Sequence, residues 1–264
     1  MKSIMKLIAL ILVLSLTACI FAGCKKNDAS SDLAYVQEKG TLVIGITDFA
    51  PMDYLGENGE WIGFDADMAK AFAAELGVKA EFVEIVWETK EMELADKNID
   101  CVWNGMTLTD AVKNAMETSN AYCNNAQVVV VKSDVAAQYQ DIDSIRELNF
   151  VVEAGSAGSE QLDALGIDYI EAETQADALM EVAAGTSDAC VIDLLMAGAM
   201  IGEGTSYADL SYTVALNSEE YGVGFRKGSD LAAKLNEFFA VTYNSGVMLE
   251  IAELYGVQES LIPQ

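Results

Sequence analysis

The stretch TLVIGITDFAPMDYLGENGEWIGFDADMAKAFAAELG, residues 41–77, decides the fold of this chain. It begins with an apolar, β-branched run of buried-strand length, residues 41–46. An aromatic-rich turn follows, and then a helix predicted over 65–76, which opens with acids and stops at Gly77, where a C-terminal cap belongs. Small ligands bind at the carboxyl ends of strands in open α/β sheets, so the turn that holds Phe49 is a candidate binding loop.

Short strand and helix signals alternate along the rest of the chain. The predicted strands cover residues 42–46, 80–86, 101–103, 128–131, 150–152, 169–171, 189–192 and 223–225. The predicted helices cover residues 65–76, 89–97, 144–146, 159–165, 175–184, 194–201 and 229–254. This alternation predicts βα units and mainly parallel sheets, in one large domain or two small ones.

A family resemblance begins at GFDADMAKAFAAELG, residues 63–77. This segment resembles the Gly-Phe-Asp-x-Asp signature of bacterial solute-binding protein family 3, whose members deliver polar amino acids and related compounds to ABC importers. Further landmarks follow in the family's order, at residues 99–109, 120–130, 155–158, 187–193 and 220–228. The resemblance covers about residues 33–257.

The resemblance implies an α/β fold of the two-lobed periplasmic-binding-protein class, type II. Each lobe would be a mainly parallel sheet flanked by helices, and two strands would form a hinge. Lobe 1 would comprise residues 33–126 and 222–264, and lobe 2 residues 127–221. Composition marks neither crossing, so this division depends on the resemblance alone.

The N-terminus predicts an extracytoplasmic protein. Two lysines precede an apolar run that ends in Ala22-Gly23-Cys24, which is typical of a lipoprotein signal peptide over residues 1–23; a transmembrane anchor is the alternative. The resemblance implies cleavage before Cys24 and lipid attachment to its thiol, with Cys19 as the alternative site. Residues 24–32 would then tether a soluble domain to the cell membrane.

Composition excludes several classes of function. Without Lys2 and Lys6 of the leader, the chain has 13 basic and 42 acidic residues, a net charge of −29, which repels nucleic acid and anionic lipid. This acidity either serves solubility or attracts cationic ligands. His is absent, and Cys101, Cys123 and Cys190 lack the spacing of metal ligands, so we predict buried free thiols, no metal site and no cofactor.

One side of the expected site is aromatic. Phe49 and Trp87 align with the two aromatic walls that sandwich the ligand side chain in the family, and such faces also hold cations. The alternative is that both are ordinary core residues, although both follow predicted strands. Gly105 and Thr107 align with residues that give main-chain and hydroxyl hydrogen bonds to the ligand.

The other side is acidic. Asp193 ends a predicted strand and aligns with the acid that pairs the ligand's α-ammonium, though it could also cap the following helix. Ser156 and Ala157 open the helix predicted at 159–165, whose unpaired N–H groups can hold a carboxylate; an ordinary helix start is the alternative. Glu153 stands where the family often has Gln or Lys, so it adds an anion.

The chain departs from the family at Val112, which takes the place of the Arg that clamps the ligand α-carboxylate. Lys113 is adjacent, but an ammonium does not reproduce a planar guanidinium fork. Two ligand classes are therefore compatible with the sequence. One is an α-amino acid held by Ser156, Ala157 and Lys113, and the other is a more cationic or carboxylate-poor solute.

The resemblance implies a non-catalytic, monomeric binding protein. Its lobes would close on a small polar amino acid or cationic amine and pass it to an ABC permease with its ATPase. A sensory protein that docks on a membrane receptor is one alternative. A dehydratase or lytic enzyme on the same fold is another, although the absence of His leaves only acids for acid–base chemistry.

Overall fold

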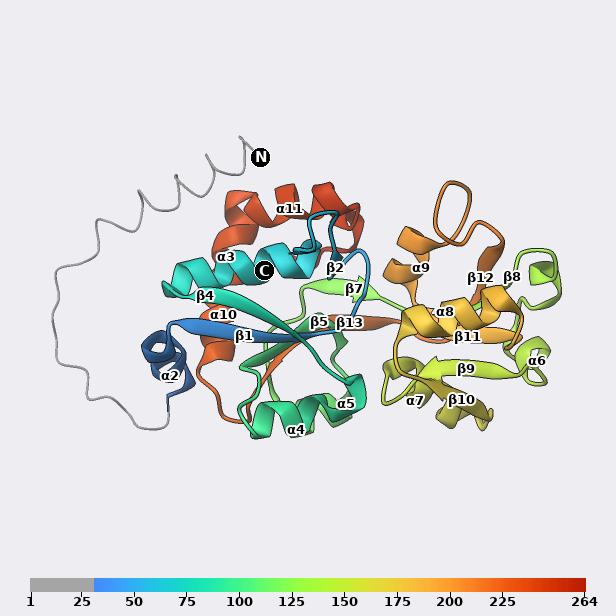
Figure 1. Ribbon diagram of the computed structural model, residues 1–264, viewed down its shortest axis with the longest axis horizontal. Coiled ribbons are helices and arrows are strands. Elements are labelled where there is room, and N and C mark those ends of the chain that lie inside the picture. The colour runs from blue at the N-terminus through green and yellow to red at the C-terminus, as the bar shows by residue number, and fades with distance from the viewer. Residues whose placement is uncertain (1–30) are drawn as a thin grey trace, which may run out of the picture. The chain divides into compact units, whose positions relative to one another are not determined.

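The computed structural model describes residues 31–264, of which 32–264 form one compact unit (Figure 1). The predicted signal peptide and both candidate lipidation residues, Cys24 and Cys19, lie outside the described residues. Among the helices of this described part, none combines the length and the apolar character needed to span a membrane.

The first sheet has six strands. Its order is β4-β1-β5-β13-β6, and β7 also pairs with β13. The strands are β1 (Thr41–Ile46), β4 (Lys79–Glu84), β5 (Cys101–Thr107), β6 (Glu117–Thr118), β7 (Cys123–Asn125) and β13 (Glu219–Phe225). β1 runs parallel to β4 and β5, whereas β13 runs antiparallel to its three neighbours.

The second sheet has five strands in the order β10-β9-β11-β8-β12. They are β8 (Gln127–Lys132), β9 (Phe150–Glu153), β10 (Tyr169–Ala172), β11 (Ala189–Asp193) and β12 (Leu210–Ala215). β9 pairs in parallel with β10 and β11, and β8 pairs antiparallel with β11 and β12. A short hairpin of β2 (Tyr54–Leu55) and β3 (Trp61–Ile62) stands apart from both sheets.

The α/β class is confirmed, but parallel pairing covers only part of each sheet. The antiparallel strands β8 and β13 enter directly from the other sheet, because only Ala126 separates β7 from β8 and only residues 216–218 separate β12 from β13. Such direct connections replace the helical crossover that parallel neighbours require.

The sheet pattern supports a two-lobed description. We propose that the first sheet and its helices are lobe 1, predicted over 33–126 and 222–264, and that the second sheet is lobe 2, predicted over 127–221. β13 spans the predicted boundary, since it begins at Glu219.

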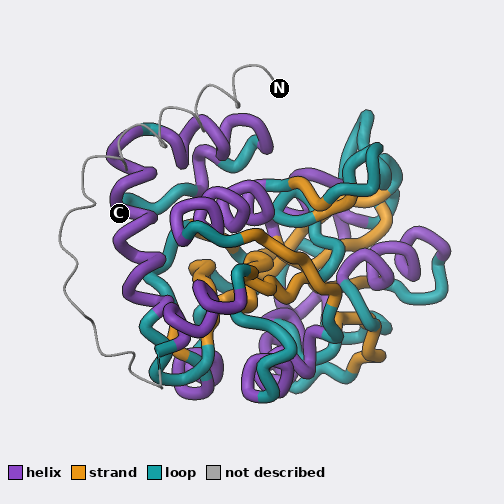
Figure 2. The backbone as a smooth tube through the Cα atoms, turned by 60° about the vertical axis from the view of Figure 1, so that its left-hand side comes forward, coloured by secondary structure: helices purple, strands orange, loops and turns teal. Residues whose placement is uncertain are grey.

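Helices flank the strands (Figure 2). They are α2 (Asp32–Lys39), α3 (Phe64–Leu76), α4 (Lys90–Ala95), α5 (Asp110–Ala115), α6 (Ile142–Ile145), α7 (Ala157–Leu165), α8 (Gln175–Ala184), α9 (Leu194–Met200), α10 (Leu231–Ser245) and α11 (Val247–Tyr255). The single helix expected over 229–254 is broken at Gly246, whose φ of 84° ends α10 in the left-handed conformation. Helices α2 and α5 are not among the predicted helices.

Helix α3 confirms the central prediction. It buries Phe64, Met68 and Phe72 along one face, and the Phe72 ring lies 6.2 Å from the ring of Trp103 on β5. Gly77 ends the helix with a φ of 75°. At its start, the N–H groups of Phe64 and Asp65 donate to the backbone oxygens of Pro51 and Met52, so the helix holds the β1–β2 loop that carries Phe49.

The second sheet is apolar on both faces. Val128 and Val130 of β8 pack with residues of α8 and α9, while Val129 and Val131 pack with those of α7. This alternation follows from the two-residue period of a strand, and it explains the unbroken valine run at 128–131. The second sheet is therefore covered by helices on both faces.

Candidate functional site

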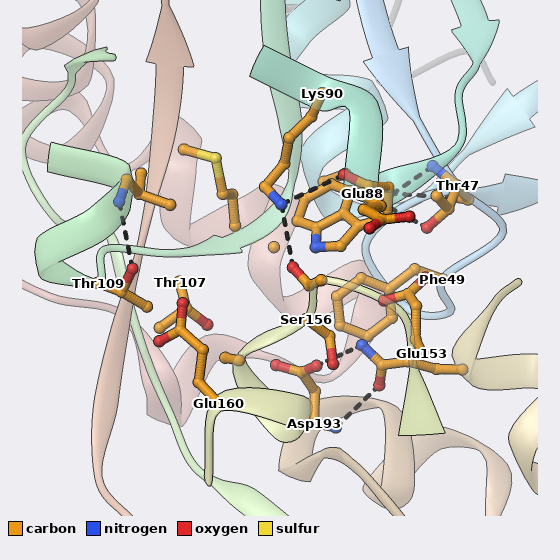
Figure 3. A pocket seen from close by; sticks show the side chains of 18 of the residues that line it. Thr47, Phe49, Glu88, Lys90, Thr107, Thr109, Glu153, Ser156, Glu160 and Asp193 are labelled. Atoms are coloured by element: carbon orange, nitrogen blue, oxygen red, sulfur yellow. Dashed lines mark hydrogen bonds between the residues drawn. The ribbon is translucent and has the colours of Figure 1, made fainter. Parts of the chain in front are cut away.

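One cavity of about 210 Å³ brings all eight predicted site residues together (Figure 3). The first sheet's side contributes Phe49, Trp87, Gly105 and Thr107, and the second sheet's side contributes Glu153, Ser156, Ala157 and Asp193. These residues lie at or just after the ends of β1, β4, β5, β9 and β11. Their contact with a ligand stays a prediction.

The aromatic wall depends on a glycine. Gly105 has a φ of 56°, and a Cβ at this position would lie 2.3 Å from Cε1 of Phe49. The absence of a side chain therefore lets the Phe49 ring lie against β5. The edge of Phe49 also meets Tyr221, with 6.4 Å between ring centroids. Trp87 begins a 3₁₀ turn over residues 87–89, directly before α4.

Asp193, at the end of β11, is buried in a network of donors. Its Oδ1 accepts hydrogen bonds from Tyr221 Oη at 2.6 Å, Asn125 Nδ2 at 2.5 Å and Gln127 Nε2 at 3.1 Å, and its Oδ2 accepts one from Gln175 Nε2 at 2.5 Å. Burial, followed by repulsion from Glu219, raises the pKa of Asp193 to about 7, although the donors oppose this shift.

The alternative role of Asp193 as a helix cap is wrong. It occupies the N-cap position of α9, but its side chain makes no capping hydrogen bond there. The carboxylate points instead toward the cavity and Gln175 (Figure 3).

Glu153, at the end of β9, is only 3% exposed, and its Oε1 has no hydrogen-bond partner. Burial, with repulsion from Asp193, raises the pKa of Glu153 to about 8, while the positive charge of Lys90 lowers it in part. A buried carboxyl oxygen without a donor is unfavourable. Because Glu153 lines the cavity, a guest that supplies a donor would relieve this cost.

The loop after β9 leads into α7, which begins at Ala157, two residues earlier than predicted. Ser156 is its N-cap, and the Ser156 hydroxyl accepts a hydrogen bond from the Ser159 N–H at 3.1 Å. Gly155 has a φ of 65°, and a Cβ there would lie 3.0 Å from Cα of Glu88. The loop therefore touches the opposite side of the cavity.

The Thr107 hydroxyl already has a hydrogen-bond partner within the protein. It donates to Glu219 Oε1 at 2.9 Å, so toward a guest this oxygen is available as an acceptor. Glu219 also receives hydrogen bonds from Asn125 at 2.7 Å and Gln127 at 2.8 Å. The end of β5 is thereby fixed to the start of β13, next to the links between the sheets.

Sequence reasoning missed Lys90, the basic residue in the cavity lining. Its Nζ donates to the backbone oxygens of Trp87 at 3.2 Å and Gly155 at 3.1 Å, and it lies 4.8 Å from the centroid of the Trp87 ring. Burial lowers the pKa of Lys90, opposed first by Glu153. Lys113, which the sequence suggested, is exposed and does not line the cavity, so that suggestion is wrong.

Acids outnumber bases around the cavity. Besides Glu153 and Asp193, the exposed residues Glu88, Glu91 and Glu160 line it. Val112 lines it too, at the position where an arginine would be expected. The resulting field favours guests that carry a positive group.

The solved structures that resemble this chain have a type II periplasmic-binding-protein fold. The P235GK mutant of ArgBP from T. maritima superposes with a TM-score of 0.80 at 29% identity, covering 85% of this chain and 99% of that one. The predicted fold class is therefore confirmed.

Sequence comparison identifies the family. Residues 42–258 match the bacterial extracellular solute-binding proteins, family 3, and the chain belongs to this family. It is 26% identical to the L-cystine-binding protein TcyJ of Escherichia coli K12, over 83% of each chain. It is also 28% identical to the arginine-binding extracellular protein ArtP of Bacillus subtilis 168, over 89% of this chain and 90% of that protein.

Proposed function

We propose that this solute-binding protein captures a small polar amino acid, or a related solute with a cationic amine, and delivers it to the permease and ATPase of an ABC importer. The observation that carries the proposal is Glu153, a buried carboxyl with an unpartnered oxygen on the cavity wall. The relatives named above bind amino acids, which supports the same ligand class.

Each wall has its own task in this proposal. Phe49 and Trp87 hold the guest's side chain between their rings. Asp193 and Glu153 take its ammonium through charge-assisted hydrogen bonds. A second set of groups binds the polar end of the guest, namely Gly105, Thr107, Ser156 and Ala157.

Capture requires no chemistry. The protein acts as a monomer without a cofactor, and the guest leaves unchanged. The two lobes close on the guest by bending at Ala126 and residues 216–218, the connections between the sheets. The relatives named above are binding proteins, which supports this non-catalytic assignment.

A lipid anchor would hold the protein at the outer face of the cell membrane. Cleavage before Cys24 makes it the first residue of the mature chain, and its thiol carries the lipid. Metabolic labelling with a palmitate analogue tests this, since a Cys24→Ser variant should lose the label and a Cys19→Ser variant should keep it. Loss of label in Cys19→Ser alone would move the anchor to Cys19.

Thermal-shift screening tests the capture of a solute. L-amino acids, polyamines and betaines are screened, and isothermal titration calorimetry then measures any hit. We expect at least one amino acid to raise the melting temperature, because a ligand that binds only the folded state stabilises it. If no solute in the panel binds, the proposed function is wrong.

A matched pair of variants tests the site. Glu153→Gln should weaken binding about 10- to 100-fold, since it removes the charge that meets the ammonium. Glu171→Gln removes an acid from β10, next to β9 but exposed, and should leave the affinity unchanged. Equal effects of the two variants would show that overall charge, and not the cavity, attracts the solute.

A further inference from the structure

Lys90 and Glu153 are a buried base and a buried acid that do not touch. Both are buried, at 8% and 3% exposure, and both line the cavity. Opposite charges in a poorly solvated site normally pair, because low polarity strengthens their attraction. In residues 31–264, however, no ion pair within 4.0 Å joins Lys90 to Glu153 or to another carboxylate.

Two backbone carbonyls hold Lys90 away from the acids. Its ammonium donates to the oxygens of Trp87 and Gly155, which lie on opposite sides of the cavity, and it lies over the Trp87 ring. Figure 3 shows the side chain descending from α4 toward the loop that contains Ser156. An ammonium has three donors, so one remains for a guest.

The guest that fits this arrangement carries both a negative and a positive group, with the negative group next to Lys90 and the positive group next to Glu153. A carboxylate would accept the third hydrogen bond of Lys90, beside the N-terminus of α7, whose dipole also favours an anion. An ammonium would meet the unpartnered oxygen of Glu153 and the carboxylate of Asp193. Such a guest pairs both buried charges, whereas a simple amine leaves Lys90 unpaired next to another cation.

We infer that Lys90 is the specificity-determining residue that selects zwitterionic amino acids over carboxylate-free amines. The inference rests on the proposed function and decides between the two ligand classes that the sequence left open. It assigns to α4 the task that an arginine at Val112 would otherwise perform.

Calorimetry with matched solutes tests this assignment. The probes are L-arginine with agmatine, L-histidine with histamine and L-cystine with cystamine; each amine lacks only the carboxylate of its amino acid, or both carboxylates in the case of cystamine. The wild type should bind the amino acid of at least one pair at least about tenfold more tightly than its amine. Lys90→Met should weaken the amino acid about 10- to 100-fold and leave the amine unchanged or tighter, because a charged hydrogen bond is lost and a repulsive cation is removed.

Lys113→Met is the matched control, since it removes an exposed lysine on the same side and should change neither affinity. If Lys90→Met does not fold, a second measurement on the wild type takes its place. It uses the methyl ester of the bound amino acid, in which the carboxylate is neutral, and the wild type should bind this ester as weakly as the amine. A wild type that binds amines as tightly as amino acids, or an unchanged preference in Lys90→Met, overturns the inference while the proposed function stands. Failure of every probe and every screened solute overturns the proposed function itself.

Discussion

Two pairs of buried acids can be compared in this molecule. Asp53 and Asp65 are fully buried in lobe 1, while Glu153 and Asp193 are buried in lobe 2. Burial is the largest cause of a raised pKa in all four, to about 7 for Asp65 and Asp193 and about 8 for Glu153. Desolvation alone therefore does not mark a binding site.

The pairs differ in what they face. Asp65 accepts hydrogen bonds from the Gly105 N–H and the Tyr122 hydroxyl, both at 2.7 Å, and Asp53 accepts one from Asn104 at 2.8 Å. Neither acid lines the cavity, so the Oδ1 atom of each, which has no hydrogen-bond partner, lies out of reach of a guest. Glu153 and Asp193 line it, so a guest can reach both carboxyls. We therefore predict a structural role for the lobe 1 pair and a role in recognition for the lobe 2 pair.

Substitution of Asp193 should give the largest effect. Asp193→Asn should weaken amino acid binding by about 3 kcal/mol, roughly 100-fold, because the guest's ammonium loses a buried counter-charge. Its melting temperature should fall only modestly, since Asn keeps the side chain's size and an acceptor for the donors at Oδ1, and loses one acceptor, that for Gln175. Calorimetry and thermal melting on the same samples measure both effects, and retained affinity in Asp193→Asn would contradict the comparison.

Substitution of Asp65 should act on stability instead. Asp65→Ala leaves the Gly105 N–H and the Tyr122 hydroxyl without their acceptor, which should lower the free energy of unfolding by about 2 to 3 kcal/mol. Asp65→Asn retains an acceptor and should lose less. Urea denaturation measures this, and an Asp65→Ala protein of wild-type stability would show that the lobe 1 pair is not structural.

Substitution of Gly105 should lower both the stability of the protein and its affinity for a solute. Gly105→Ala drives a methyl group into Phe49, and we expect a loss of about 1 to 2 kcal/mol in stability and roughly tenfold in affinity. Gly59→Ala is the control, since Gly59 has a φ of 73° but no atom within 4 Å of an added Cβ. Equal losses in the two variants would assign the effect to backbone strain and not to the aromatic wall.

The pH dependence should appear as a gradual slope and not as a single loss, about 1 kcal/mol per pH unit. Glu153 releases its proton near its ordinary value of 4.5 when unfolded but near 8 when folded, so the unliganded protein should lose stability as the pH rises between these values. Asp193, Lys90, Gln175 and Asp177 act on the same carboxyl. Urea denaturation from pH 5 to 8 measures the free energy of unfolding against pH. This plot should be flatter for Glu153→Gln than for Glu171→Gln. Identical slopes would show that a group other than Glu153 causes the pH dependence.

Local patterns predicted most of the fold. The strand at 41–46 and the helix at 65–76 have their own periodicity and cap, and the structure reproduces both nearly to the residue. The two-residue strands β2, β3 and β6 are too short to show a period in the sequence; β2 and β3 pair with each other in a local hairpin, and β6 pairs with the distant β13. The break at Gly246 was missed because apolar residues continue on both sides of it.

The site was predictable where residues follow strands. The family resemblance assigned Phe49, Trp87, Glu153 and Asp193 to one site, and the convergence of strand ends in an α/β fold supported that assignment. Lys90 could not, because its surrounding sequence, WETKEMEL, is typical of an exposed helix. Its burial arises from the loop after β9, a contact across 65 positions in the chain that no local pattern encodes.

The three thiols in residues 31–264 make this chain convenient for chemical labelling. Cys101, Cys123 and Cys190 are buried, and burial raises the pKa of each, so their thiolates are scarce at neutral pH. A domain that begins at Asp32 and carries Asp110→Cys would react with maleimide dyes mainly at that exposed residue, at the start of α5. One conjugation step without removal of native cysteines would then yield a fluorescent reporter of solute uptake.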